Sequence, residues 1–590
     1  MSTDYSQEFR RLTSQRENYV LLRSFHMPIG DESRHAIAVT LWASKILQSF
    51  YTLMVSVIIF HLWYIFVLVV MALAYRSKKS NPTRNHGAVN VAIWNSQASP
   101  LSIIKSMFEY RTHIPRYAFF WAFCAFLAWA GAFTMSLLIS PTLIIGTAAP
   151  ANLEEIYVPT QPELQGNLQG LRWQSLQVPT FLRAIEVLQG VDSETGDAAD
   201  LSDLDVVVQP SRRWEEAGNN MLQVDYSYNI TGVHFGLQNL PRLRMEVRGS
   251  CRTEYSWYQK ERSDSYNENF TPYTDIYEIF GEEINVTTAD GRRPVLFYSL
   301  NSDEPQQSEG NFTFAIVPST LKRRSFTEGT DPWYETQLLS STDAEEAPYE
   351  VLNGRPPLSC WEQTLWSHRG GPAVSMDHIR QLNPKLPPGI QQIFQDALSI
   401  PRILVLALGL GNMALKSSQT FVGLYFDAQT ATIHSDLQRL VYGAFISTRN
   451  VLAETTLFDR RYENELPNLV VNQSTKQYLA GVEDFVIYGS GFAALSVKVL
   501  IIIPIITVVL FFSVSLLTDN PFYTLPWGYV NALKAPVLYS ALDHEGFKEI
   551  TGDKWKRAST TPHYPEKDQP ALVRPKLEGR FLSWGSSGQE

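Results

Sequence analysis

Few residues in this chain have the types and spacing that catalysis requires. The patterns H-E-x-x-H, G-x-x-x-x-G-K-[ST] and G-x-S-x-G are all absent from the 590 residues, which argues against zincins, P-loop enzymes and ordinary serine hydrolases. Gly409–Ala414, with the sequence Gly-Leu-Gly-Asn-Met-Ala, follows a strand-like Ile403–Leu408 and imitates a dinucleotide-binding loop. Because no clear βαβ pattern surrounds it, we expect a core element here and no nucleotide cofactor.

Acids and histidines supply possible ligands without a recognisable arrangement. The segment Ala148–Asp484 holds 44 Asp and Glu residues, and a glycosidase needs only two well-placed carboxylates. A membrane-tethered hydrolase of cell-surface carbohydrate therefore stays open as an alternative, with no pair singled out. Val191–Asp205 holds six acids but lacks calcium-loop spacing, which favours a solvated loop. The histidines of the large segment lack metal-ligand spacing. They are His234, His368, His378 and His434. We expect no catalytic residue, metal or cofactor.

Two of the three cysteines predict a disulfide. Cys124 lies in an apolar run, whereas Cys251 and Cys360 are the only cysteines of Ala148–Asp484. Extracytoplasmic compartments are oxidising, so a lone pair there is usually bridged. Both follow or begin strand-like runs, and closing the long loop between them would stabilise the fold by about 4–5 kcal/mol in the chain-entropy model.

Five N-x-[ST] acceptors also fall in this one segment and nowhere else. They are Asn229, Asn269, Asn285, Asn311 and Asn472. Asn81-Pro-Thr fails because of its proline. The segregation predicts that Ala148–Asp484 is extracytoplasmic and glycosylated.

Three uncharged runs decide the class of protein. They are Ile46–Tyr75, Tyr117–Asn152 and Val499–Thr518. About 20 apolar residues suffice for a helix to cross a bilayer, so each run predicts a transmembrane helix. The mean hydropathy of −0.13 hides this segregation. No cleavable signal peptide precedes the first run, which predicts an uncleaved signal anchor.

Charge predicts the orientation of these helices. The loop Arg76–Arg116 has seven bases and one acid, and short basic loops stay in the cytosol. The N-terminal tail and Ala148–Asp484 should then lie outside. That segment has a net charge of −18, within a total of −10. We therefore expect the lipid bilayer as a partner, a protein partner bound through the outer domain or the membrane helices, and no nucleic acid.

Two features inside the runs bear on helix packing. His61 lies in the first run, where we favour a hydrogen bond to a neighbouring helix over a functional role. The second run has small residues at every fourth position, a stripe that permits close helix approach. They are Cys124, Ala128, Ala132, Ser136 and Ser140.

The outer segment alternates apolar and polar residues in its first half and has helical spacing in its second. Met221–Tyr228, Leu243–Val247 and Asn311–Val317 predict strands, whereas Gly389–Leu398 and Asp436–Leu452 predict helices. The fold class expected is thus an integral membrane protein with three transmembrane α-helices and a large α+β, β-rich extracytoplasmic domain. The predicted parts are an outer tail 1–45, helices 46–75, 117–145 and 494–517, a cytosolic loop 76–116, an outer domain 148–484 and a cytosolic tail 518–590, disordered toward its end.

Gly249–Trp257, with the sequence Gly-Ser-Cys-Arg-Thr-Glu-Tyr-Ser-Trp, resembles a segment of a family of multi-span membrane glycoproteins of filamentous fungi. The arrangement of spans is similar, and the resemblance implies topology but no activity and no site residues. We expect a multi-pass glycoprotein, at the plasma membrane in preference to an endomembrane, whose outer domain binds, senses or scaffolds. The alternatives are the hydrolase and an accessory subunit of a transport or biosynthetic assembly.

Overall fold

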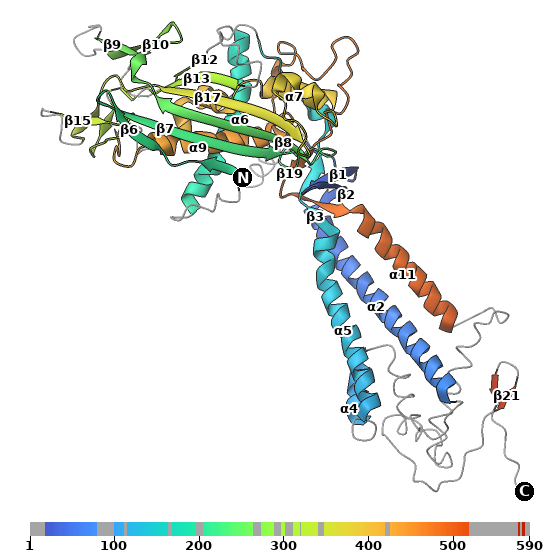
Figure 1. Ribbon diagram of the computed structural model, residues 1–590. Coiled ribbons are helices and arrows are strands. Elements are labelled where there is room, and N and C mark those ends of the chain that lie inside the picture. Colours follow the sequence, from blue (N-terminus) through green and yellow to red (C-terminus); the bar gives the residue numbers. More distant parts are fainter. Residues whose placement is uncertain are drawn as a thin grey trace, which may run out of the picture. The chain divides into compact units, whose positions relative to one another are not determined.

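The computed structural model of this protein is shown in Figure 1. It describes residues 18–78, 100–110, 115–162, 168–194, 204–263, 273–287, 297–300, 311–318, 320–321, 323–339, 347–418, 425–518, 576–578 and 581–583.

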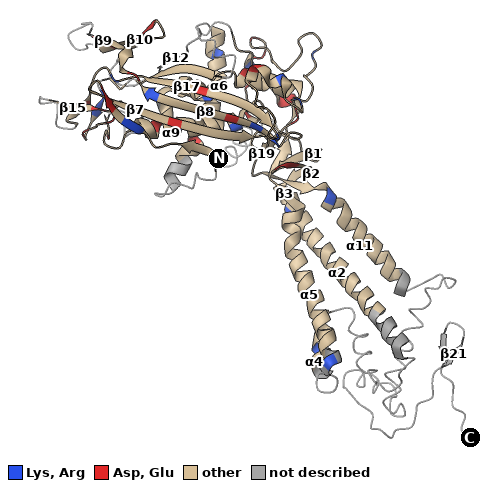
Figure 2. Ribbon diagram, viewed as in Figure 1, with Lys and Arg blue, Asp and Glu red and all other residues tan. Residues whose placement is uncertain are grey.

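Three helices are long and apolar enough to cross a membrane: α2 (Leu41–Lys78), α5 (Pro115–Leu143) and α11 (Val497–Thr518). Figure 2 shows them almost without charged residues along their length. A shorter helix, α4 (Pro100–Tyr110), packs against α5 through the buried Ile103 and Met107. This part of the basic segment was predicted to be a loop, and helix α4 was not predicted.

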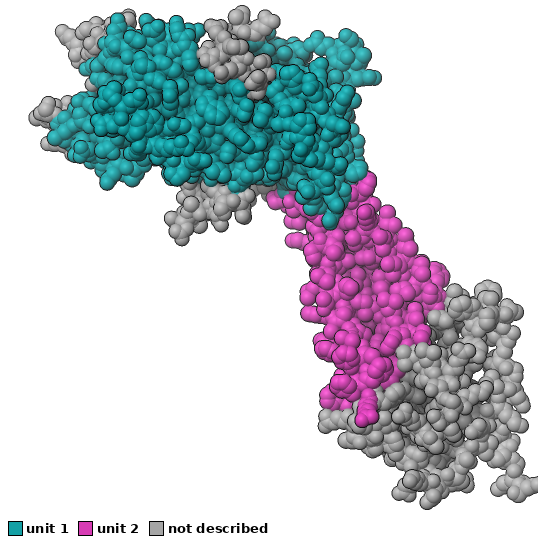
Figure 3. Space-filling model, viewed as in Figure 1, with its two compact units in different colours: residues 1–34, 148–489 teal, residues 35–147, 490–590 magenta. Residues whose placement is uncertain are grey.

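The chain divides into two units, coloured in Figure 3. We call residues 1–34 with 148–489 the sheet unit, and residues 35–147 with 490–590 the helix unit. The division into an outer tail, an outer domain and cytosolic segments stays a prediction. The described residues of the segment 1–45 that precede α2 form two strands.

In the helix unit, each membrane-length helix is continuous with one strand of a small sheet, which we call the collar. Strand β2 (Glu32–Thr40) runs directly into α2, α5 runs directly into β3 (Ile144–Gly146), and β20 (Phe492–Ser496) runs directly into α11. Strand β20 pairs with β2 on one side and with β3 on the other, so the last of these three strands to be made lies between the two earlier ones. The N-terminal ends of α2 and α11 and the C-terminal end of α5 thus meet at one sheet.

Apolar packing and a hydrogen bond between helices hold the three helices to one another. Val39, Ile139, Leu143 and Leu495 form a buried cluster where the collar meets the helices. Between helices, the Tyr51 hydroxyl donates to the Leu500 carbonyl at 2.8 Å. In a water-poor environment such bonds satisfy polar groups that would otherwise be costly to bury.

The sheet unit is built on a seven-stranded antiparallel sheet of order β12–β13–β17–β8–β7–β5, with β6 also paired to β7. Residues of β7 alternate between buried and half-buried, as the alternating sequence predicted. The strands are β5 (Val206–Val208), β6 (Arg212–Glu216), β7 (Asn219–Thr231), β8 (Leu243–Thr253), β12 (Phe297–Leu300), β13 (Asn311–Val317) and β17 (Leu358–His368).

Helices cover one face of this sheet and share one apolar core with it (Figure 1). They are α6 (Leu168–Glu194), α7 (Pro388–Ala397), α8 (Arg402–Leu410), α9 (Ile433–Arg449) and α10 (Val451–Glu454). The predicted helices at 389–398 and 436–452 correspond to α7 and to α9 with α10. Helix α6 was not predicted. Its last turn occupies Val191–Glu194, the start of the segment that was predicted to be a solvated loop.

Ile403–Leu408 is helical, within α8, so the expectation of a strand there was wrong. A dinucleotide-binding loop needs a strand before its glycines. The residues before Gly409 are helical, so this segment does not have the structure of such a loop. Its burial agrees with the expected core element, since Ile403, Leu404 and Leu406 are at most 1% exposed. The axes of α7 and α8 differ in direction by 58°. Neither helix alone is long enough to cross a membrane, and only the two together have the length and apolar composition of a candidate span.

Smaller sheets complete the described chain. A three-stranded sheet of order β11–β10–β9 covers Ala315 and Val317 at one end of β13. Its strands are β9 (Tyr258–Ser263), β10 (Tyr273–Ile279) and β11 (Glu282–Thr287). Other strands of the sheet unit are β1 (Ser24–Ile29), β4 (Ala148–Pro150), β14 (Arg324–Ser325), β15 (Thr336–Leu338), β16 (Tyr349–Val351), β18 (Tyr425–Phe426) and β19 (Val486–Tyr488). In the predicted cytosolic tail, β21 (Lys576–Glu578) pairs with β22 (Phe581–Ser583).

Residues 18–34 belong to the sheet unit through backbone and side-chain bonds. Val20 N–H donates to the Pro150 carbonyl at 2.9 Å, and Arg23 forms an ion pair with Glu483. Residues far apart in the chain therefore share one unit, which requires them to lie on the same side of any membrane.

Candidate functional site

The cysteine pair lies at disulfide distance in the centre of the main sheet. Cys251 of β8 and Cys360 of β17 are directly opposite in register, with Cα atoms 4.1 Å apart and sulfur atoms joined. Both side chains are buried. A separation above about 7 Å would have excluded the predicted bridge.

A row of three residues crosses the sheet beside this pair. Tyr226, Gly249 and Glu362 are register partners on β7, β8 and β17, and the Tyr226 hydroxyl donates to a Glu362 carboxylate oxygen at 2.8 Å. A Cβ at Gly249 would lie 2.3 Å from the tyrosine ring, so glycine is what lets the ring cross β8. Burial raises the pKa of Glu362 to about 7.

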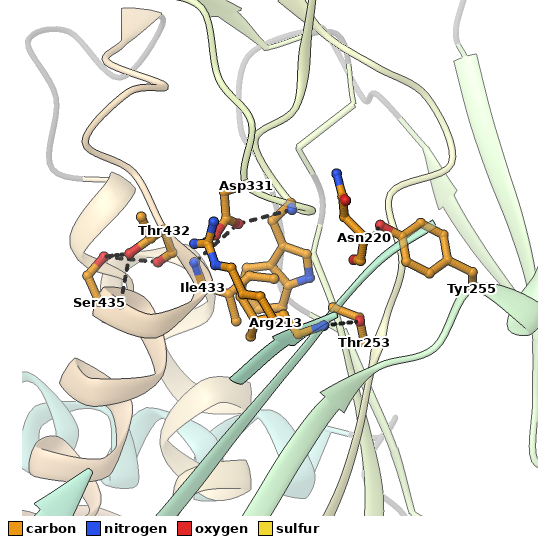
Figure 4. A network of polar contacts seen from close by, with 10 residues as sticks. Arg213, Asn220, Thr253, Tyr255, Asp331, Thr432, Ile433 and Ser435 are labelled. Carbon is orange, nitrogen blue, oxygen red and sulfur yellow. Dashed lines mark hydrogen bonds and ion pairs between the residues drawn. The ribbon is translucent and has the colours of Figure 1, made fainter. Parts of the chain in front are cut away.

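A second polar network surrounds the N-terminus of α9, and Figure 4 shows part of it. The Asp331 carboxylate accepts hydrogen bonds from the Trp333 and Ile433 backbone N–H groups, both at 3.2 Å, and faces Arg213 at 3.4 Å. Thr432 caps the helix, since its hydroxyl accepts from Ser435 N–H at 3.1 Å. Burial raises the pKa of Asp331 to about 6, although these hydrogen bonds oppose the shift.

One turn into α9, the fully buried Asp436 has its carboxylate held by three donors. Ser417 donates from its backbone N–H at 2.9 Å and from its hydroxyl at 2.8 Å, and the Tyr334 hydroxyl also donates. Burial raises the pKa of Asp436. Every acceptor is used, so this network has the character of a structural element.

A cavity of about 140 Å³ lies in the sheet unit. It is enclosed by α6, the corner between α7 and α8, and α10. Aromatic and aliphatic side chains make most of its wall, including Trp173, Phe181, Leu404 and Phe458. An engineered apolar cavity of about 150 Å³ binds benzene, so the volume suits a small ring or a short chain.

Two charged residues at the α7–α8 corner give the cavity its polarity. Asp396 ends α7, and Arg402 begins α8 after Pro401. The Arg402 guanidinium is buried, donates to the Ser447 hydroxyl at 2.7 Å, and lies 5.3 Å from the ring centre of Phe181. Its Nε makes no hydrogen bond within the described chain. Burial lowers the pKa of Arg402 to about 10.

Asp396, which is half-buried, differs from the buried carboxylates described above. Within the described residues its carboxylate has neither a hydrogen-bond donor nor an ion-pair partner. Burial raises its pKa to about 6, and the charge of Arg402 opposes that rise. The cavity therefore presents an acceptor and a donor, Asp396 and Arg402 Nε, that the described chain leaves unused.

The second carboxylate of the cavity is already occupied. Both oxygens of Glu454 accept from the Arg183 guanidinium. A glycosidase needs two carboxyl groups free to act on one substrate. This cavity offers one, and among its described lining residues there is no histidine or cysteine to replace the other.

Sequence reasoning missed the cavity, although a signal was present. Between Lys385 and Lys416 the only charged residues are Asp396 and Arg402, and they flank Pro401. An acid and a base isolated in an apolar segment at a helix break indicate a buried polar site. The remaining walls come from residues as distant as Val158 and Phe458, which no local pattern connects.

The predicted acceptor asparagines have different surroundings. Asn285 on β11 and Asn472 are exposed, and Asn229 on β7 and Asn311 on β13 are half-buried. Asn269 lies outside the described residues. Glycosylation of the five stays a prediction.

The predicted small-residue stripe lies on the half-buried side of α5, at Cys124, Ala128, Ala132, Ser136 and Ser140. The hydroxyl oxygens of Ser136 and of Ser56 on α2 are 3.4 Å apart. His61 was expected to bond a neighbouring helix, and this was wrong. Its Nδ1 lies 2.7 Å from the carbonyl oxygen of Val57, one turn earlier in the same helix. Side chains in helices commonly bond to the carbonyl four residues before them.

The family comparison identifies the sheet unit. The model of a domain of unknown function (DUF8406) matches residues 178–487, just over half of the chain. The match begins inside α6 and ends at β19, so it omits α2, α5 and α11. Neither the curated proteins nor the solved structures gave a match.

Proposed function

The chain belongs to the family of the domain of unknown function DUF8406, and on that premise we propose a three-span membrane protein whose sheet unit faces outward and binds a small amphipathic molecule. The bilayer is its first partner, and the plasma membrane is its proposed location. The unused Asp396 carboxylate in an otherwise apolar cavity is the observation that carries the binding proposal.

The collar supports the topology. Because the starts of α2 and α11 and the end of α5 meet at one sheet, α5 runs opposite to the other two helices. Chain connectivity then assigns residues before α2 and residues between α5 and α11 to the same side. The bonds between residues 18–34 and the rest of the sheet unit agree with this assignment.

Charge and acceptor sites support the direction. The seven bases of Arg76–Arg116 favour the cytosol, and all five acceptor asparagines fall on the opposite side. Endoglycosidase treatment should shift the gel mobility of the full-length protein. Replacing all five asparagines by glutamine should abolish the shift, and a wild-type protein without any shift would refute the outward placement.

The cavity favours a ligand with a small apolar body and one polar group that donates to Asp396. Removing the ligand's apolar part from water supplies most of the affinity, while the carboxylate fixes orientation. A hydrolase is less well supported, since Glu454 is held by Arg183. A role in a larger membrane assembly has no specific contact in its favour.

Thermal unfolding of the detergent-solubilised protein with benzylamine and with toluene tests the binding proposal. Benzylamine should raise the Tm, more so as the pH rises through about 6 and Asp396 ionises. Asp396→Asn should lose this effect but keep any effect of toluene, and Ala397→Phe should lose both by filling the cavity.

Asp377→Asn is the matched control, because Asp377 is exposed and lies outside the cavity lining. It should respond to both probes as the wild type does. Equal benzylamine responses in the Asp396 and Asp377 variants would refute the assignment of the carboxylate.

A further inference from the structure

The face of the main sheet opposite the helices carries a large exposed side chain with polar register partners. Trp361 of β17 is 49% exposed, on the side of the sheet opposite the buried Cys360 and Glu362. Its register partners on the two neighbouring strands are Thr313 of β13 and Ser250 of β8. In the described chain no ring or cation lies against the indole.

An acceptor asparagine shares this face one step away. Asn311 pairs with Gln363, and Trp361 pairs with Thr313, so Asn311 and Trp361 are diagonal neighbours on adjacent strands. Such residues have Cα atoms about 7–8 Å apart, within reach of long side chains. Because strand residues two apart share a face, Asn311, Thr313 and Trp361 all project from the same side.

The Asn311 side chain is available for modification. It is half-buried, and the described chain makes no hydrogen bond to its amide group. The hydroxyl that the acceptor sequence needs belongs to Thr313, directly opposite Trp361. Any glycan on Asn311 therefore starts beside the indole.

We propose that Trp361 is the stacking platform for the glycan carried by Asn311, which covers the open face of the sheet. A sugar ring has an apolar C–H face and a polar rim, which match an indole ringed by polar neighbours. Arg248 and Arg252 flank the indole on β8 and are both exposed. They form ion pairs with Glu246 and Glu254, and their remaining N–H groups supply donors for the sugar hydroxyls. The inference rests on the proposed outward placement of the sheet unit.

Two other described acceptor sites, Asn229 and Asn472, lack this arrangement. Asn229 lies on β7, two strands from Trp361, with Glu246 as its cross-strand neighbour. Asn472 lies in a turn, where its side-chain oxygen accepts from Ser474 N–H at 2.9 Å. Asn229 is on the main sheet and Asn472 is not, and neither is a diagonal neighbour of Trp361.

Hydroxyl-radical footprinting of the full-length glycoprotein tests the proposal. Trp361 should be protected in the wild type, and its oxidation should rise severalfold in Asn311→Gln and in Thr313→Val, both of which remove the acceptor sequence. Thr313→Ser keeps the acceptor sequence and should keep the protection. Asn472→Gln removes a distant acceptor and should leave Trp361 oxidation unchanged.

Stability gives a second measurement. Asn311→Gln and Trp361→Ala should each lower the Tm by about 2–4 °C, and the double variant should be no worse than either, since both remove one contact. Additive losses would overturn the stacking contact.

Glycopeptide mapping separates the two levels of the proposal. A chain glycosylated elsewhere but not at Asn311 would overturn this inference and leave the outward placement intact. A chain with no glycan at all would overturn both. A glycan at Asn311 with unchanged Trp361 oxidation in Asn311→Gln would overturn the stacking alone.

Discussion

The network at the N-terminus of α9 and the cavity beside α7 and α8 each contain an aspartate shielded from solvent, but the two carboxylates have different partners. Burial raises the pKa of Asp331 and of Asp396 to about 6 in each case. Asp331 accepts two backbone N–H bonds and faces Arg213, whereas Asp396 has no such partner in the described chain. A raised pKa thus reports burial in both regions, and the partners distinguish a structural carboxylate from one available to a ligand.

The largest effect is expected at Asp436, next to Asp331 in the network. In Asp436→Asn an amide NH₂ group replaces one carboxylate oxygen. Ser417 and Tyr334 both donate to this carboxylate, so at least one buried donor would lose its acceptor. We expect a loss of about 3–5 kcal/mol in the free energy of unfolding. Thermal and denaturant unfolding of the purified protein measure it, and a Tm equal to that of the wild type would contradict the structural role.

Glu362 gives the next largest effect, with a defined pH dependence. Its pKa rises from 4.5 to about 7 on folding, which means that the folded state disfavours the charged carboxylate. This destabilisation is complete above pH 7, and it is absent below pH 4.5, where the group is protonated in both the folded and the unfolded state. Glu362→Gln should therefore be more stable than the wild type at pH 8, by about 2–3 kcal/mol, with the difference vanishing by pH 4.5.

Unfolding at closely spaced pH values measures this difference. The wild-type stability should fall between pH 4.5 and 7 relative to the variant. A variant that is less stable than the wild type at pH 8 would show that the charged carboxylate is favoured by contacts beyond Tyr226.

A smaller effect of the same sign is expected at Asp396. Asp396→Asn removes a carboxylate whose ionisation opposes folding above pH 6, and takes no hydrogen bond from the described chain. We expect a gain of about 1–2 kcal/mol at pH 7.5 and no gain at pH 4, after allowing for solvent in the cavity. Destabilisation at pH 7.5 would place Asp396 with Asp436 among the structural carboxylates.

The smallest effect is expected at the helix cap. Thr432→Ala deletes the hydroxyl that accepts from Ser435 N–H, which typically costs about 1 kcal/mol. The Tm should fall while the benzylamine response of the cavity stays unchanged. A changed response would show that the two regions are energetically coupled.

Features with a local signature were predictable from the sequence. Uncharged runs predicted α2, α5 and α11, alternation predicted β7, β8 and β13, and counting cysteines predicted the pair Cys251 and Cys360. Helix α6 was not predictable in the same way, because it contains Pro179 and its apolar residues are not confined to one stripe.

The cavity and the buried networks depend on contacts that are distant in sequence. Asp436 meets Tyr334 across 102 residues, and Arg183 meets Glu454 across 271. The role of a carboxylate depends on its burial and on its hydrogen-bond partners. Neither can be read from the residues next to it in the sequence. The sequence could therefore supply the candidates, 44 acids in the large segment, but not a choice among them.

The collar also imposes an order on synthesis. Strand β20 is the middle strand, and it is translated about 350 residues after β3. At about 5–20 residues per second, the ribosome takes roughly 20–70 s to cover that stretch. During this time α2 and α5 are already made, while the inner edges of β2 and β3 have no β20 to pair with. A nascent chain that stalls before Phe492 would leave the edges of β2 and β3 that face β20 without a partner, and unpaired strand edges are sites of aggregation.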